Sequence, residues 1–294
     1  MSKGIISSVM ASCLFAVMYF YTSLLSPLDG EEIFGWRTLL TLPCLTLFMW
    51  ASKDWKRVGE LLARVRQTPM LLGMLGTSWL MGVQLWLFLW APLHGRSLEV
   101  SMGYFLLPLA MVLTGRLVYG ERLSRLQAVA VGCAALGVGH ELYQNGSFAW
   151  ETLLVTIGYP IYFVLRRRCR TDHLGGLWCD MCLLLPWALY FVTQGPLSAA
   201  DLHQHPGLYG LIPLLGAISA CALIAYVLAS RLLPFSLFGL LSYVEPVLLV
   251  GVALLLGETI GPDQWLTYLP IWAAVLVLVL EGFKHLLRQR RRSV

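Results

Sequence analysis

Charged residues are scarce in this sequence. Asp, Glu, Lys and Arg make up 13% of the 294 residues, whereas about a quarter of a soluble globular domain is charged. Hydrophobic residues make up 58% and come in long runs rather than in amphipathic stripes. A soluble fold of this composition would lack polar surface to face water, so the sequence predicts an all-α protein embedded in a membrane.

Catalytic and redox motifs are also missing. The seven cysteines are an odd number, which argues against a disulfide framework, and Cys179 and Cys182 form a lone CxxC inside a predicted membrane helix. None of the six histidines has metal-site spacing with other ligands, and no Ser/His/Asp set or Walker sequence can be assembled. We therefore expect no enzyme, no ATP-driven pump and no cofactor.

The first apolar run is too long for a signal peptide. It covers 5–25, against about 7–15 residues for the apolar region of a secretory signal, and further apolar runs follow it. We interpret it as a retained first membrane helix.

Long apolar runs set the predicted architecture. A helix needs about 20 apolar residues to cross the hydrocarbon core. The longest connection, 52–68, contains five basic residues and is expected to be an amphipathic segment on the membrane surface. The ten predicted spans are 4–25, 32–51, 69–91, 97–119, 123–139, 150–167, 174–194, 207–230, 235–256 and 263–283.

Basic residues predict the orientation, because loops rich in Lys and Arg stay in the cytoplasm. With both termini cytoplasmic, the inside receives 52–68, 166–170 and the tail from Lys284 to Arg292. The net charge of +5 follows from this bias, so no nucleic-acid partner is expected. The predicted outer loops hold Arg96 as their one basic residue beside Asp29, Glu31, Glu141, Asp201 and Asp263.

Two distant segments resemble each other. The run "LPLAMVLTGRLVYGERLSRLQ" from Leu107 and the run "EPVLLVGVALLLGETIGPDQW" from Glu245 share a proline, an apolar stretch, Gly-Glu and then Gln. Five helices per copy would invert the second copy, as in many secondary transporters. The predicted parts are a first repeat at 1–145, a second at 146–284 and a basic tail at 285–294. A chance likeness between apolar stretches is the alternative.

One motif adds a family resemblance. The run "GEEIFGWRTLLTLPCLTLF", Gly30 to Phe48, together with the two Gly-Glu helix ends, resembles the RarD proteins of the EamA branch of the drug/metabolite transporter superfamily. The likeness covers the whole chain and implies a multi-pass permease of the bacterial inner membrane. It also implies that helices 1–4 and 6–9 enclose a central cavity, with helices 5 and 10 at its rim. The second half keeps the motif only as "HLGGLWCD".

Charges inside predicted spans need a reason, because each costs at least about 2.5–3.5 kcal/mol at the helix centre on insertion scales. Glu245 lies about eleven residues into 235–256, near the midplane, and Pro246 disfavours helical geometry there. This arrangement suits a proton or solute site. A protonated structural acid bonded to a neighbouring helix is the alternative.

Arg37 is the matching candidate cation. It lies some five residues into 32–51, and a guanidinium binds carboxylates with two donors at any cellular pH. It could bind an anionic solute or pair with Glu99 or Glu245. Snorkelling to the outer surface is the alternative.

Two further acids are candidates. Asp180 lies six residues into 174–194, where it could face a cytoplasmic vestibule or pair with one of the arginines at 166–168. Glu99 opens the span 97–119, where an acid also stabilises a helix N-terminus without any further role.

Aromatic rings and an amide inside the predicted helices are candidates to line a solute pathway. Flat rings beside a few polar groups suit an amphipathic or aromatic solute. Interfacial belts explain aromatic residues equally well, so both interpretations stay open. These candidates are Trp79 and Gln84 of 69–91, Tyr104 of 97–119 and Tyr243 of 235–256.

Together these features favour a secondary transporter of a small metabolite or drug-like solute, working by alternating access. A solute gradient, exchange or protons through Glu245 could drive it. A channel or facilitator stays an alternative, because a gated pore shares the same features. A membrane enzyme would need catalytic groups clustered in its loops, and the short predicted loops do not offer them. A sensor or scaffold usually has a soluble output domain, and the short loops leave no room for one. The expected partners are a small solute and the bilayer.

Overall fold

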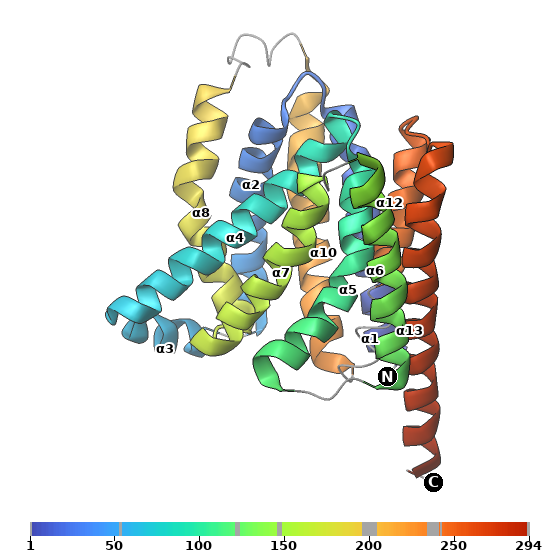
Figure 1. Ribbon diagram of the computed structural model, residues 1–294. Coiled ribbons are helices and arrows are strands. Elements are labelled where there is room, and N and C mark those ends of the chain that lie inside the picture. The colour runs from blue at the N-terminus through green and yellow to red at the C-terminus, as the bar shows by residue number, and fades with distance from the viewer. Residues whose placement is uncertain are drawn as a thin grey trace. The chain divides into compact units, whose positions relative to one another are not determined.

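The computed structural model describes residues 2–52, 55–120, 124–145, 149–195, 205–233, 241 and 243–292. Within these ranges every regular element is a helix, which confirms the all-α class. The α-helices, shown in Figure 1, are α1 (Ser2–Tyr21), α2 (Gly30–Ser52), α3 (Lys56–Val65), α4 (Thr68–Leu93), α5 (Ser97–Tyr119), α6 (Arg125–Asn145), α7 (Trp150–Cys169), α8 (Leu174–Gln194), α10 (Leu208–Leu232), α12 (Val244–Leu255) and α13 (Trp265–Arg292). Two short 3-10 helices are η1 (Thr22–Leu25) and η2 (Pro262–Gln264).

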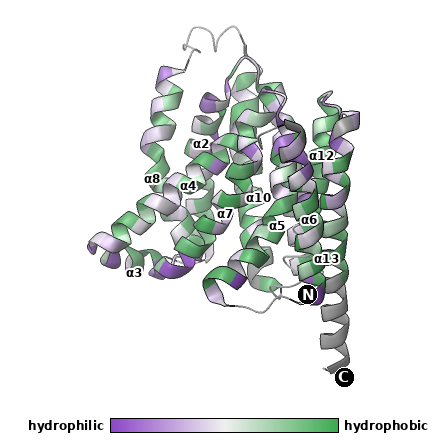
Figure 2. Ribbon diagram, in the orientation of Figure 1, coloured by the Kyte–Doolittle hydropathy of each residue, from purple (hydrophilic) through white to green (hydrophobic). Residues whose placement is uncertain are grey.

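Six of the described helices are long and apolar enough to cross a bilayer. Two more apolar stretches, Val244–Leu255 and Trp265–Val277, are shorter. Figure 2 shows hydrophobic residues along most helices. The chain is therefore a multi-pass membrane protein, while ten spans and cytoplasmic termini stay predictions. The six are Lys3–Leu25, Gly30–Ser52, Thr68–Leu93, Ser97–Tyr119, Leu174–Gln194 and Leu208–Ala229.

The connection predicted to be amphipathic contains α3. Its Val58 and Leu61 are buried, and the helix packs against α4 and α8. Lys56 and Arg57 on the same helix are exposed. The alternation follows the helical period, so one side of α3 packs on the protein and the other carries charge.

The chain divides into two compact units. Unit 1 consists of Met1–Cys13, Gly95–Pro160 and Leu228–Val294, and unit 2 of Leu14–His94 and Ile161–Val227. Unit 1 contains α5, α6, α12 and α13, and unit 2 contains α2, α3, α4 and α8. Each unit thus takes helices from both predicted repeats, 1–145 and 146–284, and the boundary between these repeats stays a prediction.

Close packing of α2 on α8 organises unit 2. A Cβ on Gly35 would lie 2.7 Å from the carbonyl oxygen of Ala188, so only a glycine allows this approach. Further along, Trp178 Nε1 donates to Thr46 Oγ1 over 2.9 Å. The start of α2 therefore lies beside the end of α8, and the end of α2 lies beside the start of α8. The two helices are antiparallel.

In unit 1, α13 packs along α6. A Cβ on Gly137 of α6 would lie 2.7 Å from the carbonyl oxygen of Thr267, so the two backbones meet closely here. Ile271 and Tyr268 of α13 are buried in the core of this unit. Small residues on one helix thus permit the close contact that holds the pair together.

The two similar segments of unit 1 share two local geometries. Gly120 ends α5 with a φ of 68°, and Gly257 ends the turn after α12 with a φ of 89°. Both values lie in the left-handed region, which favours glycine. After each, a glutamine side chain accepts a backbone N–H three residues earlier: Gln127 from Ser124 at 3.0 Å, and Gln264 from Gly261 at 2.9 Å. The paired sequence features therefore have matching structural roles.

Candidate functional site

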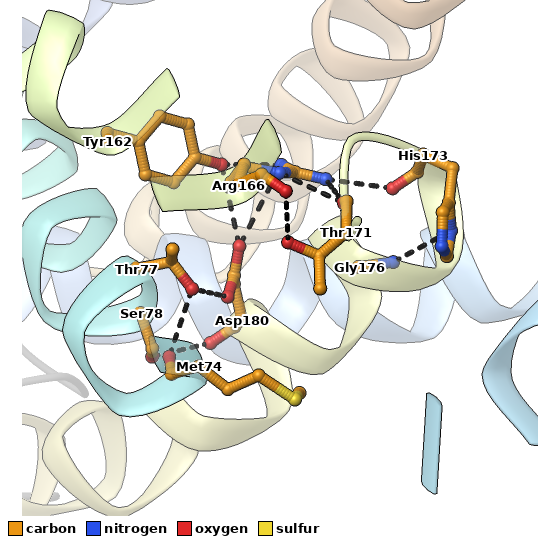
Figure 3. Close-up of polar contacts among 9 residues, drawn as sticks. All are labelled: Met74, Thr77, Ser78, Tyr162, Arg166, Thr171, His173, Gly176 and Asp180. Carbon is orange, nitrogen blue, oxygen red and sulfur yellow. Dashed lines mark hydrogen bonds and ion pairs between the residues drawn. The ribbon is translucent and has the colours of Figure 1, made fainter. Parts of the chain in front are cut away.

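A buried acid on α8, Asp180, is the centre of the polar cluster shown in Figure 3. Asp180 is 1% exposed. Its Oδ1 accepts a hydrogen bond from Thr77 Oγ1 of α4 over 2.8 Å, and its carbonyl oxygen accepts one from Ser78 Oγ over 2.9 Å. Two adjacent hydroxyl groups of α4 thus bind the side chain and the backbone of one residue of α8.

The charge of Asp180 is balanced from α7. Its Oδ2 lies 3.8 Å from Arg166 NH1, and Tyr162 OH donates to the same oxygen over 3.5 Å. Arg166 NH1 in turn donates to Tyr162 OH over 2.5 Å. Because Arg166 and Tyr162 are one turn apart, α7 presents both to the acid together.

Arg166 also holds the turn between α7 and α8. Its Nε donates to Thr171 O over 3.0 Å, and its NH2 donates to Thr171 O and, over 2.9 Å, to His173 O. The guanidinium therefore satisfies backbone carbonyls that would otherwise be buried without partners.

These contacts decide between two interpretations of Asp180. The predicted pairing with an arginine at 166–168 is confirmed, and the partner is Arg166. The side chain is too buried to face an open vestibule in this conformation. The cluster joins α4, α7 and α8. Separating α7 from α8 here would break a buried ion pair, and separating α4 from α8 would break two buried hydrogen bonds.

Arg37 of α2 does not snorkel to the surface. It is 1% exposed, and its Nε donates to Ser219 Oγ of α10 over 2.9 Å. Its guanidinium lies over the ring of Phe88 of α4, 5.8 Å from the centroid. Helices α2, α4 and α10 thus place a permanent cation inside unit 2.

Arg37 and Asp180 occupy similar depths from opposite ends. Arg37 is seven residues beyond Gly30, the first residue of α2, and Asp180 is six beyond Leu174, the first of α8. At 1.5 Å per residue these positions are about 10 Å and about 9 Å along their helices. Because α2 and α8 are antiparallel, the two charges lie toward opposite ends of unit 2.

The candidates on α4 have different surroundings. Gln84 is buried and lies one turn before Phe88, the residue beneath Arg37. Trp86, two residues after Gln84 and not among the candidates, donates from its Nε1 to Glu31 Oε1 over 2.9 Å. Trp79 is 63% exposed, which favours a lipid-facing position and does not bring it into the buried cluster around Arg37.

Glu99 belongs to a polar cluster of unit 1. Arg96 NH1 lies 2.9 Å from Glu99 Oε1, and Arg96 Nε lies 3.2 Å from Glu151 Oε1 at the start of α7. Glu258 accepts the backbone N–H groups of Ser97 and Leu98, each over 2.8 Å, and so caps α5. Acids at the helix N-terminus are stabilising, as the simpler interpretation of Glu99 requires.

The remaining candidates also lie in unit 1. Tyr104 OH is 2.9 Å from Tyr159 OH, and Tyr243 is buried in the core of the unit. Glu245 was predicted eleven residues into a helix, but the described helix α12 begins at Val244, directly before it. Pro246 explains this start, because proline suits the first turn of a helix. Residues 234–240 and 242 lie outside the described ranges.

Sequence reasoning missed the hydroxyl residues of both clusters. Thr77 and Ser78 form an adjacent pair in an apolar run, which is a recognisable signal. Ser219 has no such signal, because it is 182 residues from Arg37 in the chain. Glu151, with no exposed side-chain surface, lies at the start of the predicted span 150–167 and is not among the predicted site residues.

Comparisons with known proteins give the family context. No family model matches the chain. The chloramphenicol-sensitive protein RarD of Pseudomonas aeruginosa is 45% identical over 294 residues, which cover 99% of this chain and 98% of that protein. An uncharacterized transporter of Pasteurella multocida is 42% identical over 98% of this chain and 99% of its own. A solved crystal structure aligns with this chain at a TM-score of 0.55 and 18% sequence identity, and the alignment covers 95% of this chain and 98% of the other chain. This similarity shows a likeness of fold alone.

Proposed function

This chain belongs to the RarD family, and on that premise we propose that it is a secondary transporter that moves a small solute across the bacterial inner membrane by alternating access. Full-length relatives named as transporters support a transport role. No part of the proposal requires a cofactor or a catalytic step.

The observation that carries the proposal is the buried guanidinium of Arg37. A charge inside a membrane helix costs at least about 2.5–3.5 kcal/mol on insertion scales, and such residues commonly mark a solute path. Its Nε donates a hydrogen bond to Ser219 Oγ, and one face of the guanidinium lies over the ring of Phe88. A guanidinium binds carboxylate or phosphate groups with two donors, so we infer that the solute carries a negatively charged group.

The composition of the two units supports alternating access. In the predicted arrangement, each helix of the first repeat has an inverted counterpart in the second. Unit 1 contains the fourth, fifth, ninth and tenth predicted helices, which form two such pairs, and unit 2 contains most of the other three pairs. Such a division suits a carrier whose inverted halves exchange conformations.

Proton coupling is one of three ways in which transport could be driven, beside exchange and the gradient of the solute itself. Glu245, in the first turn of α12, and Asp180, in the α4–α7–α8 cluster, are the two acids concerned. A carrier driven by exchange or by the solute gradient alone would need neither acid to change charge during transport.

A thermal-shift screen tests the proposal directly. The purified protein would be screened against a library of metabolites and antibiotics, because a ligand at about 100 times its Kd stabilises a protein by about 2.7 kcal/mol. Each hit would be repeated with Arg37→Ala, with Glu245→Gln and with Arg125→Ala, a matched loss of an exposed arginine on α6.

The expected result is an anionic or zwitterionic hit that stabilises the wild type and Arg125→Ala but not Arg37→Ala. Equal stabilisation of all variants would remove Arg37 from the solute site. A library without any hit would favour a sensor or scaffold over a transporter.

A further inference from the structure

Exposed basic residues gather at one end of unit 2, on α3 and on the turn after α7. Arg64 NH2 of α3 donates to the carbonyl oxygen of Cys169, the last residue of α7, over 3.0 Å. This bond places α3 beside the end of α7 and joins two basic segments that are about 100 residues apart in sequence. The basic residues of this surface are the half-buried Arg64 and the exposed Lys56, Arg57, Arg66, Arg167, Arg168 and Arg170.

The positive charge of this surface is only partly balanced by its own acids. Within the described ranges 56–66 and 166–172, the acidic residues are Glu60 and Asp172, against eight basic residues, of which Arg166 is buried. Arg57 and Arg64 are seven residues apart, about two helical turns, and so lie on the same side of α3. Figure 2 shows hydrophilic residues at α3.

Arg170 has a conformation that its residue type disfavours. Its φ is 52°, in the left-handed region, and it is the one non-glycine residue with positive φ in the part of the chain that the structure describes. Glycine is the usual residue at such a helix end, because a Cβ is strained there. An arginine at this position adds an exposed positive charge to the turn, which glycine would not supply.

Apolar side chains border the same surface. Leu62 of α3 is 57% exposed, and Leu72 in the first turns of α4 is 63% exposed. Trp55, just before α3, packs edge-on against Trp178 of α8, with ring centroids 5.2 Å apart. Guanidinium groups beside exposed leucines match a phospholipid, whose phosphate lies next to its acyl chains.

We propose that α3 and the α7–α8 turn form a binding site for the headgroup phosphate of an anionic phospholipid. Arg168 and Arg170 supply guanidinium donors from the end of α7, and Arg66 supplies another from the end of α3. Leu62, one helical turn before Arg66 and on the same face, contacts the acyl region. The site needs only that the protein lies in a membrane, so it stands or falls independently of the proposed transport.

Lipid titration of the delipidated protein in an uncharged detergent tests the proposal. The unfolding midpoint would be followed while phosphatidylglycerol, phosphatidylcholine with the same acyl chains, or inorganic phosphate is added. The variants are Arg168→Gln and Arg170→Gly. Arg125→Gln, an exposed arginine of α6 in unit 1, is the control for a general loss of charge.

Phosphatidylglycerol should raise the midpoint more than phosphatidylcholine or inorganic phosphate does. Each site variant should bind it about fivefold more weakly, since a basic residue near an anionic lipid surface contributes about 1 kcal/mol. Arg125→Gln should bind as the wild type does. Without lipid, Arg170→Gly should be at least as stable as the wild type, which separates lipid binding from folding.

Equal stabilisation by phosphatidylcholine or by inorganic phosphate would overturn the proposal. Equal weakening by Arg125→Gln would also overturn it, because the attraction would then depend on total charge rather than on this surface. Unchanged affinity in both site variants would do the same.

Discussion

The ion pair between Asp180 and Arg166 offers a quantitative test of the α4–α7–α8 cluster. Replacing Arg166 with Met leaves the carboxylate of Asp180, which is 1% exposed, without its cation. Breaking a buried ion pair by removing one partner costs about 3–5 kcal/mol. Arg166→Met also removes the donors to Thr171 O and His173 O, so we expect the upper part of that range.

Asp180→Asn should be milder. The amide oxygen can still accept from Thr77, and Arg166 keeps its backbone acceptors, so we expect the lower limit of the range, about 3 kcal/mol. In the double variant no buried charge of Asp180 remains. The free energy of unfolding lost in the double variant should therefore fall short of the sum of the two single losses by about 0.5–3 kcal/mol, the usual coupling between residues in one network.

The assay is equilibrium unfolding of the purified protein in detergent, followed by tryptophan fluorescence. Trp178 of α8 lies two residues from Asp180 and reports on the same helix. A matched control is Thr193→Val, which removes an exposed hydroxyl at the other end of α8 and should change stability little. Additive losses for Asp180→Asn and Arg166→Met would refute the argument that the two charges stabilise each other.

Three further substitutions test the packing and the helix ends by the same unfolding assay. Glu258→Ala should cost about 0.5–2 kcal/mol, because it removes the cap of the Ser97 and Leu98 N–H groups; no loss would show that water replaces the cap. Gly257→Ala should cost about 1–2 kcal/mol, because φ is 89° there; an unchanged midpoint would mean that the turn relaxes. Gly35→Ala should cost about 1–3 kcal/mol by forcing α2 from α8, since its Cβ would lie 2.7 Å from Ala188 O; greater stability would contradict the close packing.

Helix positions could be predicted well where an apolar run has clear limits. The spans predicted at 97–119 and 174–194 coincide with α5 and α8 in the structure. Gly120 and His173 explain this accuracy, because a left-handed glycine ends α5 and a side-chain cap on Gly176 N begins α8. The start of α12 could not be predicted, because apolar composition alone does not show where Pro246 begins a helix.

The site could be predicted only in part. The sequence indicated that Arg37 and Asp180 need a reason to lie in membrane helices, and Arg166 was among the three arginines considered as a partner. Burial of Arg37 was not predictable, because an arginine near a helix end can equally reach the surface. Ser219 and Thr77, on other helices, decide the local geometry, and contacts between residues more than 100 positions apart leave no local pattern in a sequence.

Counterflow in proteoliposomes tests the central claim of alternating access most directly. Vesicles containing the purified protein would be loaded with a solute found in the thermal-shift screen, and uptake of the labelled solute would be measured against empty vesicles. A carrier predicts saturable uptake that internal solute accelerates and that Arg37→Ala abolishes while Arg125→Ala does not. Uptake that rises linearly with concentration and ignores internal solute would contradict the account and favour a channel.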